Sequence, residues 1–386
     1  MTKLEQLIEQ LCPDGVEYKK LIEICDEIIV PMRDRPKDLS GSIPWCRIED
    51  KEGQYFHKSL SGLGVSMETV NKMNLKVFPT GTVICSCSAS LGAYAINTQP
   101  LITNQTFIGL VCNARTLNKY LLYYMETQTD KLRSMATTGT IPYISRKKFE
   151  ELTVPLPPLE VQAEIVRILD KFTELTTELT TELANRKKQY EYYRDKVLSF
   201  NSDVETLPLT EIAEISTGSS NTNEGLAEGL YPFYVRSQEP LRKNEYEFDE
   251  TAIITAGDGV GVGKVFHYVV GKYALHQRAY RIHITSPKVL PRYYFHYMRN
   301  TFLPYIQKTL FHGSVASIRR PMLNKFPVPV PPIEEQQRIV DILDRFDKLC
   351  NDISEGLPAE IEARQKQYEY YRDKLLTFKE GGTSET

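Results

Sequence analysis

The 386-residue sequence predicts a mixed α/β protein with two globular domains separated by two long antiparallel coiled-coil helices, in a pseudo-two-fold arrangement. Three observations predict this fold class. A helical segment occurs twice, each copy carries apolar residues at helical spacing, and the remaining segments contain short strand-like runs between turn residues. A chain of this length can form two or three domains that each bury a core.

The duplication is strongest at the ends of the two helical segments. Residues 186–200 read RKKQYEYYRDKVLSF and residues 364–378 read RQKQYEYYRDKLLTF, which is identity at 12 of 15 positions. Upstream, VPLPPLEVQAEIVRILDKFTEL from Val154 matches VPVPPIEEQQRIVDILDRFDKL from Val328. The offset is 174 residues in the upstream block and 178 in the downstream block, so the second helix should be four residues longer.

Weaker similarities extend the repeat into the globular parts. GTVICSCSASLGA from Gly81 resembles TAIITAGDGVGVGK from Thr251, and LNKYLLYYM from Leu117 resembles LPRYYFHYM from Leu290. Near the start of each module, VEYKKLIEI from Val16 resembles VETLPLTEI from Val204, and this register aligns residues 2–11 with residues 190–199 at the end of the first long helix. A short amino-terminal helix is therefore expected to occupy the place of a long helix's end, so that the duplication closes on itself.

Both repeated segments should form long helices. Each follows a Pro-Pro pair, at 157–158 or 331–332, which suits a first helical turn, and continues with apolar residues at spacings of three, four and seven. A helix of about 40 residues is roughly 60 Å long. Two helices with matching apolar stripes should pair as an antiparallel coiled coil. The second contains Gly356-Leu357-Pro358, which should kink it locally.

The first long helix contains a short internal repeat. Residues 173–184 read TELT-TELT-TELA. One interpretation is an amphipathic helix with Thr and Glu facing outward. The other is a ruler whose length sets the distance between the modules, because each tetrapeptide adds about 6 Å and turns the chain by about 40° past a full turn.

The remaining segments predict two mixed α/β modules. Strands are expected at 81–85, 107–111 and 252–255, and helices with core aromatic residues at 120–125 and 293–298. The expected boundaries are 1–153 for the first module, 154–200 for the first long helix, 201–327 for the second module, 328–379 for the second long helix, and 380–386 for a disordered tail.

Composition indicates a cytoplasmic protein. There is no run of 18 apolar residues, and the first residues contain acids and lack the apolar core of a secretory signal. The seven cysteines include no CxxC pair, and Cys85 and Cys87 would merely share one face of a strand. Buried reduced thiols are therefore expected, with no metal site. The net charge of −3 does not by itself indicate a nucleic-acid binder.

Charge distribution is more informative than net charge. Residues 131–149 and 301–330 contain no acid, and each stretch precedes a Pro-Pro helix start. Both include a Gly-Thr or Gly-Ser step, which together with the charges suits phosphate binding. Their basic residues are Lys131, Arg133, Arg146, Lys147, Lys148, Lys308, Arg319, Arg320 and Lys325. Further candidates for base contact are Arg33, Arg35, Lys37, Arg236, Gln238, His276, Gln277 and Arg278, since Arg pairs with guanine and Gln with adenine.

No catalytic motif is complete. GDGVGVGKV from Gly257 departs from the phosphate-binding loop at Asp258 and Val265 and does not match GxGxxG, so a strand ending in a Gly-rich turn is the better interpretation. HExxH, GxSxG and the Asn/Asp-Pro-Pro-aromatic motif of amino-methyltransferases do not occur. These observations argue against a stand-alone enzyme.

The order of a module, a PLPPLEVQ helix ending in RKKQYEYYRDK, a second module and a VPPIEEQ helix ending in RQKQYEYYRDK resembles the specificity (S) subunits of type I restriction–modification enzymes. The resemblance covers nearly the whole chain; it is specific in the helices and loose in the modules. It implies two target-recognition domains that each read one half of a bipartite double-stranded DNA sequence. It also implies docking of two methyltransferase (M) subunits on the helices, with restriction (R) subunits joining the complex.

The resemblance also implies where the sites lie. The DNA-facing loops would be residues 137–148 and 312–320, which adds Thr138, Gly139, Thr140, Tyr143, Gly313 and Ser314 to the basic candidates above. The partner surface would include Tyr190, Tyr193, Arg194, Tyr368, Tyr371 and Arg372. The chain itself would be non-catalytic and bind no cofactor, with S-adenosylmethionine, ATP and Mg on the partner subunits. Two alternatives remain, a helical assembly scaffold that does not read DNA and a stand-alone DNA-acting enzyme.

Overall fold

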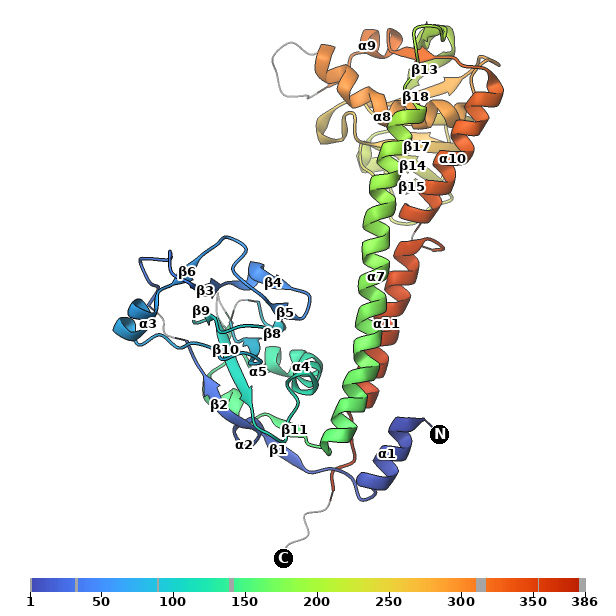
Figure 1. The fold of residues 1–386 in the computed structure, drawn as a ribbon. Helices are drawn as coiled ribbons and strands as arrows, with labels where there is room; N and C mark the ends of the chain where they lie inside the picture. Colours follow the sequence, from blue (N-terminus) through green and yellow to red (C-terminus); the bar gives the residue numbers. More distant parts are fainter. Residues whose placement is uncertain are drawn as a thin grey trace, which may run out of the picture. The chain divides into compact units, whose positions relative to one another are not determined.

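The computed structural model describes residues 2–31, 34–88, 90–138, 142–309, 317–352 and 354–381. The chain divides into two compact units, unit 1 with residues 1–178 and 361–386 and unit 2 with residues 179–360. Each unit holds one module together with segments of the repeated helices (Figure 1). The mixed α/β class with two sheet-rich domains and a long helix is as predicted.

Unit 1 is built around a six-stranded sheet with the strand order β2-β10-β7-β8-β5-β4. Two smaller sheets accompany it, β1-β11 and β6-β3-β9. Its strands are β1 (Tyr18–Lys20), β2 (Cys25–Ile29), β3 (Ile43–Cys46), β4 (Lys51–Glu52), β5 (Tyr55–Phe56), β6 (Gly64–Val65), β7 (Val83–Ser86), β8 (Tyr94–Asn97), β9 (Ile102–Thr103), β10 (Phe107–Cys112) and β11 (Thr153–Pro155). Its helices are α1 (Lys3–Leu11), α2 (Leu21–Ile24), η1 (Ile48–Asp50), α3 (Met67–Met73), α4 (Asn118–Thr127), α5 (Thr129–Met135), α6 (Arg146–Glu150), the start of α7 (Leu159–Val197) and most of α11 (Leu357–Leu375).

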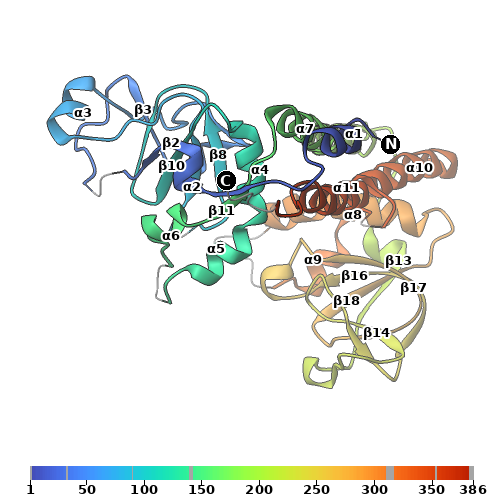
Figure 2. The ribbon, with the colours of Figure 1, turned by 90° about the horizontal axis from the view of Figure 1, so that it is seen from below.

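The main sheet of unit 2 resembles that of unit 1. It has the order β13-β18-β16-β17-β14-β15, and the parallel pair of β14 with β17 matches that of β5 with β8. The edge hairpin differs in chain order, because β15 follows β14 whereas β4 precedes β5. The strands of unit 2, most of which carry labels in Figure 2, are β12 (Thr206–Pro208), β13 (Ala213–Thr217), β14 (Tyr231–Tyr234), β15 (Leu241–Lys243), β16 (Phe248–Ala256), β17 (Phe266–Leu275), β18 (Ala279–Ile284) and β19 (Pro327–Pro329). Its helices are η2 (Leu209–Glu211), η3 (Thr222–Glu224), η4 (Gly259–Gly261), α8 (Pro291–Thr309), α9 (Arg320–Asn324) and α10 (Ile333–Asn351), with the remaining part of α7 and the first residues of α11.

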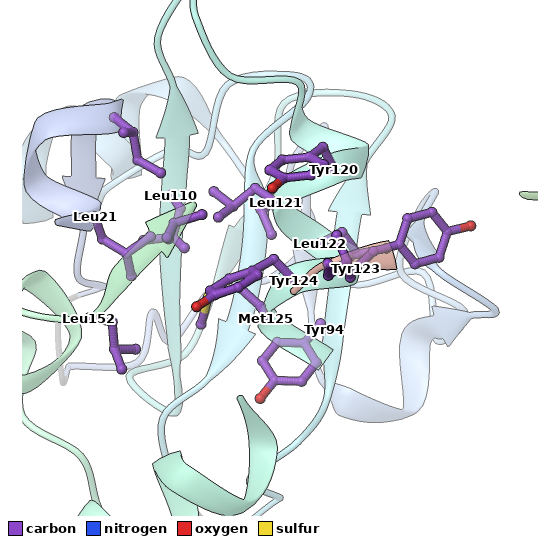
Figure 3. Packing of buried hydrophobic residues seen from close by; sticks show 14 of the residues in the cluster. Leu21, Tyr94, Leu110, Tyr120, Leu121, Leu122, Tyr123, Tyr124, Met125 and Leu152 are labelled. Carbon is purple, nitrogen blue, oxygen red and sulfur yellow. The ribbon is translucent and has the colours of Figure 1, made fainter. Parts of the chain in front are cut away.

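Both sheets are covered by a helix rich in tyrosine. In unit 1, α4 buries all six residues from Tyr120 to Met125, and Figure 3 shows them packed among Leu21, Leu110 and Leu152. The buried Tyr120 hydroxyl donates to the Pro155 carbonyl at 2.8 Å, and the equivalent Tyr293 donates to the Pro329 carbonyl at 3.0 Å. The expected strands and aromatic helices are confirmed, and the aromatic rings belong to the core, since a buried tyrosine is stable when its hydroxyl has a partner.

A buried glutamine fixes the start of each repeated helix. Gln162 accepts from the Leu117 amide at 2.9 Å and donates to the Arg115 and Pro157 carbonyls at 2.9 and 2.8 Å. Gln336 makes the same three bonds, with the Leu290 amide at 2.8 Å, the Lys288 carbonyl at 2.7 Å and the Pro331 carbonyl at 2.8 Å. Each side chain therefore joins the turn before the covering helix to the Pro-Pro segment.

Gln336→Ala is expected to lower the free energy of unfolding by about 2–4 kcal/mol, because it removes the side-chain partner of three backbone groups that are buried or partly buried. Denaturant titration followed by circular dichroism measures this loss. The adjacent Gln337 is exposed and bonds only to Asp341 on its own helix, so Gln337→Ala is the matched control and should change stability little. Equal losses in the two variants would contradict the anchoring role.

The second repeated segment is two helices, which corrects the expected single helix with a local kink. α10 ends at Asn351 and α11 begins at Leu357. Asp352 accepts from the backbone amides of Ser354 at 2.8 Å and Glu355 at 3.1 Å, and Pro358 is tolerated because it falls in the first turn of α11. The two helices have 19 residues each, against 39 in α7, so the four extra residues are taken up by the break.

Antiparallel pairing of the repeated helices is seen within each unit (Figure 1). In unit 1, the ring of Phe172 on α7 stacks on that of Tyr371 on α11, with centroids 5.4 Å apart. In unit 2, the rings of Tyr190 and Tyr193 on α7 each lie 6.0 Å from that of Phe346 on α10.

The carboxyl end of α11 closes unit 1 as the end of α7 closes unit 2. Tyr368 and Leu376 belong to the core of unit 1, as Tyr190 and Leu198 belong to that of unit 2. The expectation that residues 2–11 take this place is thereby corrected, because α1 is an additional helix whose Lys3 pairs with the buried Glu164 at 2.9 Å. A hydrogen bond from Arg167 lowers the pKa of Glu164 to about 2, although burial opposes the shift.

The expected disordered tail is only partly described. Glu380 forms a parallel bridge with Val16, and the Gly381 amide donates to the Val16 carbonyl at 2.9 Å. These two residues are therefore ordered against the first module, which corrects the expectation for them. Residues 382–386 lie outside the described residues.

Candidate nucleic-acid interface

The two modules place their basic loops at equivalent positions of the sheet. In unit 2, the residues after β16 pair with the end of the loop: Asp258 bridges Ser317, the Ile318 amide donates to the Gly257 carbonyl at 2.8 Å, and the Gly257 amide donates to the Arg278 carbonyl at 2.9 Å. We call these five residues the second edge.

The first module contains the same three connections. Ser88 bridges Tyr143, the Ile144 amide donates to the Cys87 carbonyl at 2.9 Å, and the Cys87 amide donates to the Thr106 carbonyl at 2.8 Å. We call these five residues the first edge. The segments from Gly81 and Thr251 are only loosely similar in sequence. They nevertheless share the same three backbone connections and differ in their side chains.

The second edge gathers two of the predicted arginines around one carboxylate. Asp258 accepts from Arg236 at 2.6 Å and from Arg278 at 3.1 Å, and the two arginine side chains are 39% and 62% exposed. Burial opposes ionisation of Asp258, but the hydrogen bonds and charges of the two arginines lower the pKa of its carboxyl overall. Each guanidinium is thus oriented by Asp258 while donors remain available for a ligand.

The turn at 276–278 supports this arrangement. His276 is buried, and its Nδ1 accepts from the Arg278 amide at 3.0 Å. Burial, together with the neighbouring Arg236, lowers the pKa of His276. His276 therefore shapes the turn as a neutral acceptor, which corrects its expected role as a base-contacting residue. Gln277 is exposed and donates to the Asn221 side chain.

The other candidates of the second module lie around the same edge. Arg319 and Arg320 follow directly after Ile318 and are exposed, but Arg320 is held by a 2.6 Å hydrogen bond to the Ile215 carbonyl. Gln238 is exposed two residues after Arg236. Gly313 and Ser314 lie outside the described residues.

Hydroxyl groups belong to the first edge, and lysines lie beside it on α6. Tyr143 is 40% exposed, and its backbone pairs with Thr137 through hydrogen bonds of 3.0 and 3.2 Å, which close the base of the loop. Thr138 within the loop is exposed, whereas Gly139 and Thr140 lie outside the described residues. Arg146, Lys147 and Lys148 are exposed on the short helix α6, where Arg146 pairs with Glu150 at 2.6 Å.

Arg35 and Lys37 are exposed in the segment between β2 and β3. Within the described part of the chain, no hydrogen bond or ion pair joins them to the first edge, so they are not brought into that site. Arg33 lies outside the described residues.

The predicted partner residues fall on different faces of the repeated helices. Tyr190 and Tyr368 are 9% and 8% exposed, and the Tyr368 hydroxyl donates to Glu126 at 2.6 Å, so both are internal to their units. This corrects their expected place on a partner surface. Tyr193 is partly exposed and Tyr371 is half-buried, with both stacked on a neighbouring helix. Arg194 and Arg372 lie over the Tyr190 and Tyr368 rings and bond to Asp195 and Asp373, respectively.

Sequence reasoning missed the exposed tyrosines of the same repeat. Tyr192 and Tyr370 are each 62% exposed. Lys196 lies 6.0 Å from the Tyr192 ring and Lys374 6.0 Å from the Tyr370 ring. The two units therefore present matching Tyr-Lys surfaces. The signal was available, because residues two apart on a helix lie on different faces.

Among the described residues, no group of three or more His, Cys, Asp and Glu side chains could hold a metal ion. All seven cysteines are free thiols, and burial raises the pKa of Cys85 well above its ordinary value. No helix in the described ranges is long and apolar enough to cross a membrane.

A family model for the type I restriction modification DNA specificity domain matches the chain twice, over residues 13–188 and 201–363. The chain belongs to this family of type I specificity subunits. The specificity subunit of the type I restriction enzyme EcoR124I/EcoR124II from Escherichia coli is 39% identical over an alignment of 295 positions, which covers 68% of this chain and 72% of that protein. A putative type I restriction enzyme specificity subunit from Haemophilus influenzae is 29% identical over an alignment of 409 positions, which covers 98% of both chains.

Solved structures of type I specificity subunits share the fold. The S subunit of a type I restriction–modification system from M. genitalium aligns with a TM-score of 0.61 at 14% identity, over 94% of this chain and 96% of that one. A chain from a structure of type I R-M complex assembly and conformational transition aligns with a TM-score of 0.60 at 17% identity, over 95% and 98%.

Proposed function

We propose that this chain is the DNA sequence-specificity subunit of a type I restriction–modification complex and that each module reads one half of a bipartite double-stranded target. The observation that carries the proposal is the pair of equivalent edges, which share three backbone connections but differ in their side chains. A common frame with different side chains suits two modules that dock on DNA in the same way and read different bases.

The side chains divide into positioning and reading groups. Lys147 and Lys148 on α6, and Arg319 beside the second edge, are exposed cations suited to phosphate contacts. Arg236 and Arg278 carry oriented guanidinium groups, which suit the O6 and N7 acceptors of guanine in the major groove.

The partners follow from the duplicated helices. We propose that the matching Tyr192 and Tyr370 surfaces each dock one methyltransferase subunit, so that one chain holds two identical copies. Restriction subunits would then join this core complex, which would act on DNA in the cytoplasm. The chain itself would be non-catalytic, with S-adenosylmethionine, ATP and Mg on the partner subunits. The family membership and the lack of a catalytic sequence motif support this division of roles.

The test begins with the target, which methylation-sensitive sequencing of the host genome supplies. Arg236→Ala combined with Arg278→Ala should weaken binding of the assembled methyltransferase complex to that target by at least about 30-fold, because each arginine pair with a guanine is worth about 1–3 kcal/mol. Binding to a scrambled duplex should change far less. Fluorescence anisotropy on the two duplexes measures the difference.

The exposed Arg345 on α10 supplies the control, and Arg345→Ala should leave both affinities unchanged. Undiminished selectivity in the double variant would remove the second edge from DNA reading. If charge reversal at Arg146, Lys147, Arg319 and Arg320 also left DNA affinity unchanged, the scaffold alternative would be favoured. Methylation or cleavage by the isolated chain would instead favour the enzyme alternative.

A further inference from the structure

The Gly-rich turn after β16 exposes a single aliphatic side chain. Val260 is 97% exposed at the centre of η4, between Gly259 and Gly261. Two other valines of the same segment behave differently, because Val262 and Val265 are 3% and 7% exposed and belong to the core. Single exposed valines are common on protein surfaces, so a role for Val260 has to be argued from the residues around it.

The turn directs the Val260 side chain outward. Gly259 adopts a φ of +76°, which favours glycine, and the Val262 amide donates to its carbonyl at 3.2 Å. A Cβ atom at Gly261 would lie 2.5 Å from the Arg236 carbonyl oxygen, so the backbone packs directly against the strand end. Val260 therefore lies at the tip of this turn, and its side chain is outside the core.

The tip lies beside the second edge. Val260 is two residues after Asp258, which orients Arg236 and Arg278. A shallow pocket of about 410 Å³ lies beside it, lined by Thr222, Val235, Arg236, Ser237 and residues 258–261. An exposed apolar group thus lies next to two guanidinium groups that suit guanine in the major groove.

We propose that Val260 is a specificity-determining residue that contacts the 5-methyl group of a thymine in the half-site read by the second module. The inference rests on the proposed function. The thymine methyl is the apolar group that base edges present in the major groove, and arginines that read guanine act in that same groove. Side chains that wedge between base steps are typically longer or cyclic, such as Phe, Leu, Met and Pro, whereas valine is short.

The first module differs at the same position. On the register that aligns Ser88 with Asp258, the tip residue is Ser90, which is exposed and carries a hydroxyl group. A hydroxyl can donate to or accept from a base edge, so the equivalent tip would read a polar group in the first half-site.

The experiment uses the chain assembled with its methyltransferase and duplexes of the mapped target in which each thymine of the second half-site is replaced in turn by uracil, which lacks only the methyl group. For the wild-type complex, uracil at one position should weaken binding about 3- to 10-fold, as expected for loss of a buried methyl contact. Val260→Ala should weaken binding to the thymine duplex by a similar factor and should be insensitive to uracil at that position. Val270→Ala is the control, because Val270 is 72% exposed in β17 opposite Thr251 and away from the edge.

The outcomes separate the two proposals. If the wild-type complex does not prefer the mapped target over a scrambled duplex, the proposed function fails. If it does prefer the target, three results would overturn only the role of Val260: a flat uracil series, unchanged affinity in Val260→Ala, or a second half-site without thymine. Thermal unfolding checks that Val260→Ala is folded, which its exposure leads us to expect.

Discussion

Deletion of one TELT copy, residues 177–180, is expected to abolish methylation of the natural target and to transfer it to targets whose spacer is one or two base pairs shorter. α7 is a continuous helix from Leu159 to Val197, and the boundary between the two units falls inside the repeat, between residues 178 and 179. The deletion removes about 6 Å of helix and about 40° of rotation past a full turn. Since one base-pair step is about 3.4 Å, the preferred spacing of the half-sites should shorten.

Methylation-sensitive sequencing of a methylation-deficient host that expresses the variant complex measures the new target. The control keeps the length and changes the side chains, with Thr177→Ala and Thr180→Ala in place of the deletion, and should leave the natural target methylated. An unchanged spacer in the deletion variant would favour the alternative in which the repeat is only an amphipathic helix with Thr and Glu facing outward.

The duplicated architecture could be predicted because local sequence patterns determine it. The signals that predicted the helices depend only on neighbours along the chain. They are the Pro-Pro pairs at 157–158 and 331–332 and the apolar spacing of three and four residues. The break between α10 and α11 was only partly foreseen, since Pro358 indicated a disturbance but the Asp352 turn that ends α10 depends on a specific side-chain geometry.

The structure of the two edges could not be predicted from local sequence patterns. The sequence indicated basic loops at matching positions, but Asp258 was considered only as a departure from a nucleotide-binding motif. Its role depends on a bridge to Ser317 and on arginines 22 residues before and 20 residues after it, and these long-range pairings are set by strand order. The small sheet β6-β3-β9 was missed for a related reason, because two of its strands have only two residues each.

The helix surface was misjudged for a different reason. The YEYY run places tyrosines on both faces of a helix, whereas the prediction assigned the tyrosines of the repeat to a single partner surface. Helical geometry separates Tyr190 from Tyr192 by about 200°, so one is buried while the other is exposed. Applying the helical period to that run would have identified Tyr192 and Tyr370 from the sequence.

Tyr192→Ala combined with Tyr370→Ala is expected to prevent assembly with the methyltransferase, whereas each single substitution should leave one copy bound. Tyrosine is among the residues enriched at the energetic hot spots of protein interfaces, and truncation of a hot-spot residue costs at least about 2 kcal/mol, or roughly 30-fold in affinity. Because the two surfaces are formed by the same repeated sequence, their losses should be independent and nearly equal. Native mass spectrometry at concentrations near the dissociation constant would count two, one or no methyltransferase copies per chain.

The matched control is Tyr246→Ala, a tyrosine that is 44% exposed in the second module and outside the repeated helices. That variant should retain two copies. Binding of two copies at unchanged affinity by the double variant would exclude the Tyr192 and Tyr370 surfaces as docking sites. Loss of both copies from either single variant would show that the sites are coupled, which would contradict independent docking on two equivalent surfaces and would require contact between the two methyltransferase subunits themselves.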